Sequence, residues 1–176
     1  MPRHRPDEPH DAGGATTAPA PPHGWLSEQQ QRQWRAFRDG TTLLFHVLGR
    51  ELDETSGLSM GEYEVLVRLS EAPGRALRMS ELADDLAHSR SRLTHTVARM
   101  ERAGTVRREP ARDDARGVNC VLTEHGWHVL VEAAPGHVES VRRHLVDVLD
   151  DEQLAVLGTA MQVVIDHLRG NDTPRA

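Results

Sequence analysis

The sequence predicts a mainly α-helical protein with one small β-hairpin, and three observations support this prediction. Apolar residues recur every three to four positions over most of the 176-residue chain, which is the period of a helix buried on one face. Polar N-cap residues and Gly or Pro divide these segments into successive helices. Residues 105–123 instead resemble two short strands around a charged turn.

The first helix is predicted to begin at Ser27-Glu28-Gln29-Gln30, a capping-box pattern, and to run to about Thr55. Residues 1–24 before it are rich in Pro, Gly, Ala, His and Thr without apolar periodicity, so we expect a disordered tail. One face of the helix is apolar and carries Trp34, Phe37, Thr41, Leu44, Leu48 and Leu52.

A second capping box, Ser59-Met60-Gly61-Glu62, predicts a helix that ends near Ser70, before Pro73-Gly74. Its inward residues are Tyr63, Leu66 and Leu69. A short helix with Leu82 and Leu86 follows, and then a helix between Ser89 as N-cap and Gly104 as C′ residue. Together these short helices predict a helix-turn-helix.

The helix after Ser89 has an apolar stripe of Leu93, Val97 and Met100, so its other face is polar and rich in Arg. Beyond Gly104, a turn with Asp113, Asp114 and Arg116 leads to a strand in which Val118, Cys120 and Leu122 are expected to face inward. A bare hairpin is marginally stable, so it should pack against the preceding helices.

Two helices are predicted after the hairpin. Thr123 caps the first, which we expect to be interrupted at Pro135-Gly136 and to resume through Val138, Val141, Leu145 and Val148. Asp150 begins the last, which ends at Gly170 and carries a seam of Leu154, Leu157, Met161, Val164 and Leu168. Because these faces lie outside the small helix-turn-helix core in sequence, they predict a homodimer joined through the first and last helices.

The net charge is −6, but residues 88–116 hold eight Arg against four acids, so this segment carries +4 and the remainder −10. This asymmetry predicts a nucleic-acid footprint confined to one surface. A single Cys excludes an internal disulfide, and no apolar run is long enough to span a bilayer. We therefore expect a cytoplasmic protein without a membrane partner.

A series of motifs resembles the winged helix-turn-helix of the multiple-antibiotic-resistance regulator (MarR) family. Asp114-Ala115-Arg116 precedes Leu122-Thr123-Glu124-His125-Gly126, and residues 58–66 and 79–83 match upstream; Arg78 departs from the family's usual Thr or Ser cap. The resemblance covers roughly residues 27–169. It implies tails at 1–24 and 171–176, an N-terminal dimerisation helix at 25–57, a winged helix-turn-helix DNA-binding region at 58–122 and C-terminal dimerisation helices at 123–170.

We therefore predict a homodimeric regulator, a repressor, that binds a pseudo-palindromic operator in double-stranded DNA. Arg92 and His95 are expected to read bases in the major groove, while Arg116 enters the minor groove from a turn held by Asp114. The full set of predicted DNA contacts is Ser89, Arg90, Ser91, Arg92, Thr94, His95, Arg99, Arg112, Asp114 and Arg116.

The resemblance also implies a small-molecule effector bound between the dimerisation helices and the winged helix, commonly a phenolic, other small aromatic or anionic compound. The residues that could line this cavity, and that could equally belong to the core, are Trp34, Phe37, His46, Tyr63 and Trp127.

Three alternatives remain open. Cys120 or the eleven His, among them His125 and His128, could make the protein a redox- or metal-responsive regulator. The His, Asp and Glu of the terminal helices could serve an enzyme, although no nucleophile elbow, phosphate loop, His-Glu-x-x-His or Cys pair supports one. A winged helix could also bind another protein. We expect no enzyme, cofactor or bound metal.

Overall fold

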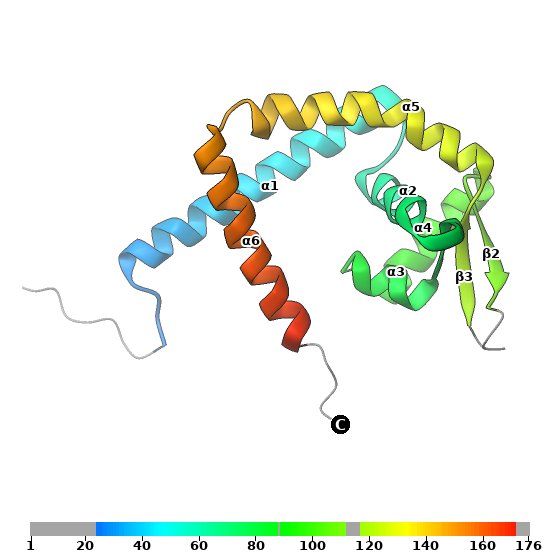
Figure 1. Ribbon diagram of the computed structural model, residues 1–176, viewed down its shortest axis with the longest axis horizontal. Coiled ribbons are helices and arrows are strands. Elements are labelled where there is room, and N and C mark those ends of the chain that lie inside the picture. Colours follow the sequence, from blue (N-terminus) through cyan, green and yellow to red (C-terminus); the bar gives the residue numbers. More distant parts are fainter. Residues whose placement is uncertain (1–23, 88, 112–116, 172–176) are drawn as a thin grey trace, which may run out of the picture. The chain divides into compact units, whose positions relative to one another are not determined.

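A computed structural model describes residues 24–87, 89–111 and 117–171 (Figure 1). By their internal contacts, the residues form two units, Met1–Asp39 and Gly40–Ala176. The predicted tails at 1–24 and 171–176 lie almost wholly outside the described residues. No helix in the described part of the chain is long and apolar enough to cross a membrane.

The first unit contains the beginning of helix α1, Glu28–Ser56. The predicted capping box is confirmed, because the Gln30 N–H donates to Ser27 Oγ at 3.2 Å and the Ser27 N–H donates to Gln30 Oε1 at 2.8 Å. Trp34 and Phe37 lie with their ring centroids 6.0 Å apart, and their exposed fractions are 51% and 39%. This aromatic pair is therefore largely on the surface of the first unit.

The core of the second unit forms where three short helices pack against a small sheet. These elements are α2 (Met60–Glu71), α3 (Met79–Asp85), α4 (Arg90–Arg102), β1 (Ala76–Arg78), β2 (Val106–Pro110) and β3 (Val118–Leu122). The predicted inward residues of α2 and α4 are all buried, as are Leu82, Cys120 and Leu122. At about 1.5–3 kcal/mol for each fully buried large aliphatic side chain, this cluster supplies most of the driving force for folding the unit.

The sheet differs from the predicted two-stranded hairpin, because β1 adds a third strand in the order β1-β3-β2, all antiparallel. Three residues, Ala76–Arg78, are too few to show an alternating pattern in the sequence. The expectation for Val118 was also wrong: it lies at the end of β3 beside the turn and is 41% exposed. Val121 is buried instead, because β3 is the central strand with a neighbour on each side.

A strained turn connects α2 to β1. Gly74 has φ 65° and Arg75 has φ 56°, and the latter is costly for a residue with a Cβ. The Arg75 guanidinium lies 4.2 Å from the centroid of the Trp127 ring and 3.3 Å from Glu124 Oε2. These two contacts with helix α5 (Glu124–Val141) help to offset the strain and fix the position of the turn.

The start of α3 lacks a side-chain cap, as expected from the Arg at position 78. A guanidinium has no acceptor for the N–H groups of the first turn, and the capping contact runs from the Arg78 N–H to Glu81 Oε2, at 3.3 Å. Half of a capping box is thus sufficient to begin this helix.

Helix α5, Glu124–Val141, begins against the end of α4, and the Leu-Thr-x-x-Gly motif accounts for the contact. Thr123 Oγ1 accepts from the Gly126 N–H at 2.9 Å and donates to the Gly104 and Thr105 carbonyls, at 2.7 and 3.0 Å. A Cβ at Gly126 would lie 2.0 Å from the Thr105 carbonyl oxygen. Only glycine therefore permits this close approach.

The predicted interruption of α5 at Pro135-Gly136 was wrong, because the helix continues to Val141. Pro135 is exposed, so the carbonyl that loses its hydrogen bond there can be hydrated. The break comes after Val141, in a π-helical turn, Arg142–Val146, where the Asp147 N–H donates to the Arg142 carbonyl at 2.8 Å.

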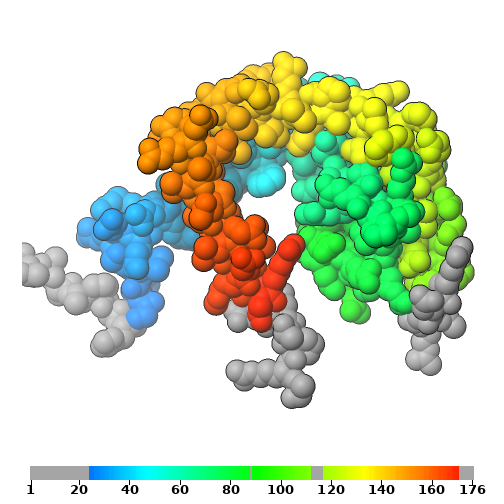
Figure 2. Space-filling model, viewed as in Figure 1, coloured from blue at the N-terminus to red at the C-terminus, as the bar shows by residue number. Residues whose placement is uncertain are grey.

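The last helix, α6, spans Asp151–Asn171 and runs one residue past the predicted end. Its capping box is present, since the Gln153 N–H donates to Asp150 Oδ1 at 2.7 Å. None of the residues 151–170 is buried. In Figure 2 this helix, orange to red, shows a long uncovered flank.

Candidate nucleic-acid interface

The structure confirms both predicted ends of helix α4. Ser89 Oγ accepts from the Arg92 N–H at 3.3 Å, so the remaining N–H groups of the first turn stay available to an anion. At the other end Gly104 has φ 76°, and the Thr105 N–H donates to the Met100 carbonyl at 3.0 Å, which is a Schellman motif.

The two faces of α4 separate as predicted. Leu93, Val97 and Met100 are no more than 2% exposed. The predicted DNA contacts on the other side are all exposed, namely Ser89, Arg90, Ser91, Arg92, Thr94, His95 and Arg99. Exposure leaves each of them able to reach a ligand, and their contact with DNA stays a prediction.

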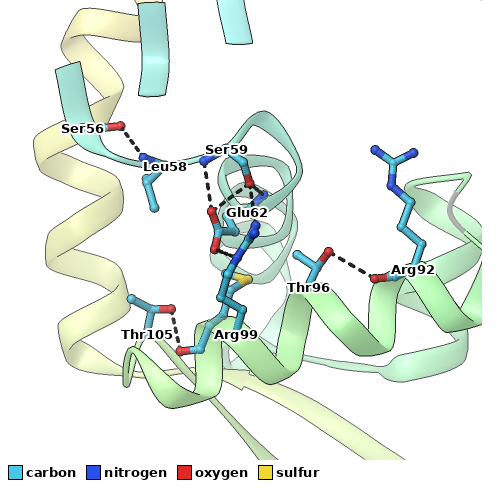
Figure 3. A network of polar contacts seen from close by, with 9 residues as sticks. Ser56, Leu58, Ser59, Glu62, Arg92, Thr96, Arg99 and Thr105 are labelled. Carbon is cyan, nitrogen blue, oxygen red and sulfur yellow. Dashed lines mark hydrogen bonds and ion pairs between the residues drawn. The ribbon is translucent and has the colours of Figure 1, made fainter. Parts of the chain in front are cut away.

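Arg99 differs from the other exposed residues, because its guanidinium is bonded to side chains at the start of α2 (Figure 3). Its Nε donates to Glu62 Oε1 at 2.6 Å and one terminal nitrogen donates to Ser59 Oγ at 3.0 Å. Glu62 also accepts from the Ser59 N–H, at 3.0 Å, so one carboxylate joins the capping box of α2 to α4. Arg99 is therefore a brace between two helices, and of the exposed Arg on α4 it is the least suited to contact DNA.

The environment of Glu62 stabilises its charged form. Burial alone would raise the pKa of this carboxyl, but hydrogen bonds from Ser59 and Arg99 and the charge of Arg99 lower it below its ordinary value of 4.5. The carboxylate therefore stays charged and paired at neutral pH.

A second ion pair joins α4 to the wing. Two nitrogens of the Arg108 guanidinium donate to Glu101 Oε2 at 2.9 and 2.6 Å, and the Arg108 N–H donates to Glu101 Oε1 at 3.0 Å. These bonds lower the pKa of Glu101. On the same strand Arg107 pairs with Glu109 at 2.6 Å. Glu101 thus fastens strand β2 to α4, and Glu101 and Glu109 together pair with two of the Arg of this segment.

The ion pairs divide the Arg of residues 88–116 into those that bind a carboxylate of the protein and those that stay available to a ligand. Arg99, Arg107 and Arg108 each contact a carboxylate. Arg90, Arg92 and Arg102 form no ion pair with any residue that the structure describes, and Figure 3 shows the Arg92 side chain extended away from the helix. The Arg of α4 that have no ion-pair partner among the described residues therefore lie in its first and last turns.

The predicted wing residues Arg112, Asp114 and Arg116 lie outside the described residues, so their DNA contacts stay predictions. The base of the wing is described: the Ala111 N–H donates to the Gly117 carbonyl at 2.8 Å, which continues the hairpin toward the turn.

A groove of about 360 Å³ adjoins the start of α4 and contains residues that sequence reasoning missed. Arg78 and Ser80 from the start of α3 line it together with Arg90 and Thr94. Ser80 belongs to the matched segment 79–83, so the motif was visible, but its position beside Arg90 depends on the turn between α3 and α4. The groove presents basic and hydroxyl groups suited to a phosphate.

A separate cavity of about 470 Å³, here named the Tyr63 cavity, lies between α2, α3, α5 and the part of α1 after Gly40. Its walls are formed by Leu44, Phe45, Leu48, Met60, Tyr63, Glu64, Val67, Arg68, Asp85, Leu86, His137, Val141 and Leu145.

Of the five predicted ligand-binding residues, only Tyr63 lines this cavity. Trp127 packs against Arg75, His46 is exposed, and Trp34 and Phe37 belong to the first unit. His137 was missed as a cavity residue because its position depends on α5 continuing past Pro135. The other four stay predictions without support from the cavity.

The sulfur of Cys120 is enclosed in the core. Its side chain is 0% exposed, and burial, with a further contribution from Glu101, raises the pKa of its thiol to about 12. A thiol of this kind is a poor nucleophile at neutral pH. Among the described residues, no three His, Cys, Asp or Glu come together as metal ligands.

Comparison with known proteins agrees with this geometry. A family model described as MarR family matches residues 56–117. The transcriptional regulator PecS of Dickeya dadantii is 31% identical over 130 residues, which cover 71% of this chain and 77% of PecS.

Two solved structures from Streptomyces coelicolor are more similar in sequence. AbsC, a MarR family transcriptional regulator, is 46% identical with a TM-score of 0.77, covering 83% of this chain and 98% of AbsC. Sco3205, a MarR family regulator solved in complex with DNA, is 44% identical with a TM-score of 0.78, covering 82% and 94% of the two chains.

Proposed function

We propose, from the premise that this chain belongs to the MarR family of DNA-binding transcriptional regulators, that it is a homodimeric repressor of a pseudo-palindromic operator, released by a small molecule. The observation that carries the proposal is the exposed face of α4, where Arg90, Arg92 and His95 protrude while neighbouring Arg are engaged in ion pairs. Repression is the expected direction because a bound dimer would obstruct polymerase on the DNA it covers.

The dimer is proposed because of α6. A helix of 21 residues that buries none of residues 151–170 in its own chain gains little from folding alone. Val156, Val163 and Leu168 are 62%, 66% and 59% exposed, which is unusual for large aliphatic residues unless another surface covers them. A second copy related by two-fold symmetry supplies that surface.

The reading of DNA is proposed for the first two turns of α4. The helix N-terminus and Arg90 suit a phosphate, whereas Arg92 and His95 lie where side chains of an inserted helix reach base edges. Arg is the residue best shaped for two parallel hydrogen bonds to guanine. Two such helices per dimer favour half-sites about 10 base pairs apart or a multiple of it.

The wing is proposed to add a minor-groove contact beside each half-site. Arg116 would insert where the groove is narrow, Asp114 would hold the turn, and Arg112 would contact the backbone. The ion pair between Glu101 and Arg108 supports this proposal because it fixes the wing strand to α4.

The effector is proposed to bind the Tyr63 cavity, whose volume of about 470 Å³ lies within the usual range for ligand pockets. Its walls come from α2 and α3 of the helix-turn-helix and from α1 and α5 outside it. A ligand that prefers one arrangement of these helices would shift the dimer toward or away from DNA, by no more than its differential affinity.

The test begins by selecting operators from random duplex and measuring affinity by fluorescence anisotropy. Arg92→Ala is expected to cost about 1–3 kcal/mol and to relax preference at one base position. Arg50→Ala, an exposed Arg on α1 paired with Glu54, is the matched control and should bind normally. A uniform loss across sequences would reassign Arg92 to a phosphate, and no loss would remove α4 from the interface.

Dimerisation is tested separately by analytical ultracentrifugation. Removal of residues 151–176 should abolish dimerisation and specific binding together. Leu157→Glu in the intact chain places a charge on the α6 seam and should do the same without truncation. A monomer that keeps full operator affinity would refute the two-fold arrangement.

A further inference from the structure

The charged side chains that line the Tyr63 cavity are mostly acidic. Glu64, Arg68 and Asp85 are its charged lining residues. Arg68 is already engaged, since one of its terminal nitrogens lies 3.6 Å from Glu71 Oε2. Neither Glu64 nor Asp85 forms an ion pair within the part of the chain that the structure describes. Among the described residues, the two carboxylates of the cavity therefore have no ion-pair partner, and they outnumber its one Arg.

His137, which lines the cavity, has a buried ring nitrogen without a partner in the described part of the chain. Nδ1 of His137 is buried and has no hydrogen-bond partner among the described residues. The His137 ring centroid lies 4.5 Å from that of Tyr63, so the ring is held against the cavity wall. Burial lowers the pKa of His137 below 6.5, which keeps the imidazole neutral at neutral pH. A buried polar atom without a partner is costly. In the tautomer that carries its proton on Nε2, Nδ1 is an acceptor, and a ligand N–H that reaches it gains a hydrogen bond.

The remaining wall is apolar and aromatic. Phe45 and Tyr63 present rings, while Leu44, Val67 and Leu145 provide aliphatic surface. Such a wall accommodates an apolar body, and the faces of the two rings attract a positive charge. A carboxylate or phenolate would instead meet Glu64, Asp85 and a neutral imidazole, with the one Arg already paired.

We propose that the Tyr63 cavity takes an organic monocation, an apolar and preferably aromatic body that carries a protonated amine. The body packs on the aliphatic and ring surface, and the ammonium group faces the acceptors of Glu64, Asp85 and His137. This deepens the effector part of the proposed function, on which it rests, and it departs from the anionic ligands that the family resemblance implies.

The test measures direct binding to the full-length protein without DNA, by calorimetry at near-neutral pH and low ionic strength. The probes are phenethylammonium, phenethyl alcohol and hydrocinnamate, which share a phenyl body and differ in charge. Phenethylammonium should bind tightest, with hydrocinnamate roughly tenfold weaker or worse, since each nearby charge changes affinity several-fold even when partly solvated. Added salt should narrow this difference.

Charge-neutral variants identify the responsible groups. Glu64→Gln and Asp85→Asn should each weaken phenethylammonium about threefold to tenfold and leave phenethyl alcohol unchanged. Asp84→Asn is the matched control. It removes the same charge at the residue next to Asp85, and the Asp84 side chain does not line the cavity. His137→Phe keeps a ring against Tyr63 and should weaken both N–H and O–H probes, whereas His128→Phe on the exposed side of α5 should change neither.

Operator affinity, measured on the same samples, separates the two proposals. The cation inference would be overturned if hydrocinnamate bound as tightly as phenethylammonium, or if Glu64→Gln and Asp85→Asn weakened phenethylammonium no more than phenethyl alcohol. The absence of binding by all three probes would likewise overturn it. Normal operator binding in the same samples would leave the proposed repressor function unaffected. If the unmodified protein binds no operator, the proposed function is refuted instead.

Discussion

Replacement of Arg99 by Ala distinguishes a structural brace from a DNA contact. The variant removes the donors to Glu62 Oε1 and Ser59 Oγ and leaves a carboxylate whose side chain is only 12% exposed. A charge-assisted hydrogen bond contributes roughly 1.5–3 kcal/mol. The Arg99 side chain is 54% exposed, so solvent screens part of this interaction, and about 1–2 kcal/mol is the expected loss in the free energy of unfolding.

The assay is thermal and denaturant unfolding at a fixed protein concentration, followed by circular dichroism. At about 2–4 °C per kcal/mol for a chain of this size, Arg99→Ala should lower Tm by roughly 2–8 °C. Arg92→Ala, on the same helix, should change stability by no more than about 0.5 kcal/mol and should instead weaken operator binding. If Arg99→Ala unfolds normally and reduces the salt dependence of DNA binding, the brace is refuted and Arg99 is a phosphate contact.

The pH dependence gives a second check on the same contact. The pKa of Glu62 is lowered in the folded protein relative to 4.5, so its pairing stabilises the fold fully above that value and is lost as pH falls through the lower, folded pKa. The stability difference between the wild type and Arg99→Ala should therefore be constant near neutrality and shrink below about pH 4.5. A difference that persists unchanged in acid would exclude the charged pair as its source.

Three further outcomes are expected. Gly126→Ala should cost about 2–4 kcal/mol, because its Cβ would lie 2.0 Å from the Thr105 oxygen, whereas Gly136→Ala on the same helix should be neutral or stabilising; thermal unfolding compares them. Cys120 should react with iodoacetamide roughly a hundredfold more slowly in the native than in the unfolded protein, and rapid native labelling would revive a redox sensor. Arg116→Ala should weaken operator binding most on A·T-rich flanks, and an unchanged affinity would make the wing only a structural hairpin.

Local signals in the sequence predicted most of the fold. Ser59, Ser89 and Thr123 each accept a hydrogen bond at the start of a helix, as their capping patterns indicated. The predictions failed where contacts between residues far apart in the sequence determine the local structure. β1 forms because Leu77 pairs with Cys120, forty-three positions later, and Val118 is exposed because it lies at the end of its strand. Pro135 remains helical because it is exposed, so that the carbonyl that loses its hydrogen bond can be hydrated.

The sequence predicted which face of α4 forms the candidate site, but not which Arg on that face are paired with acids. The outer face of α4 follows from helical periodicity, so Arg92 and His95 could be placed on it from the sequence alone. Whether an Arg on that face is available depends on acids brought close by folding: Glu62 reaches Arg99 across thirty-seven positions. The Tyr63 cavity could not be predicted residue by residue, because four separate helices form its walls.

The division between paired and available Arg also sets the strength of the salt dependence. If all eight Arg of residues 88–116 contacted phosphates, a dimer would neutralise about sixteen, and the slope of log K against log salt would approach about −14. Three of the eight are paired with acids, which leaves five per protomer, including Arg112 and Arg116 outside the described residues. For the Arg of this segment alone, about ten contacts per dimer give a slope near −9, and Arg92 reading a base rather than a phosphate reduces it to about −7. Arg78 lines the groove beside α4, and a phosphate contact from it in each protomer would add about −2 to the slope. A measured slope steeper than about −12 would therefore mean that DNA breaks the ion pairs of the wing and of α4.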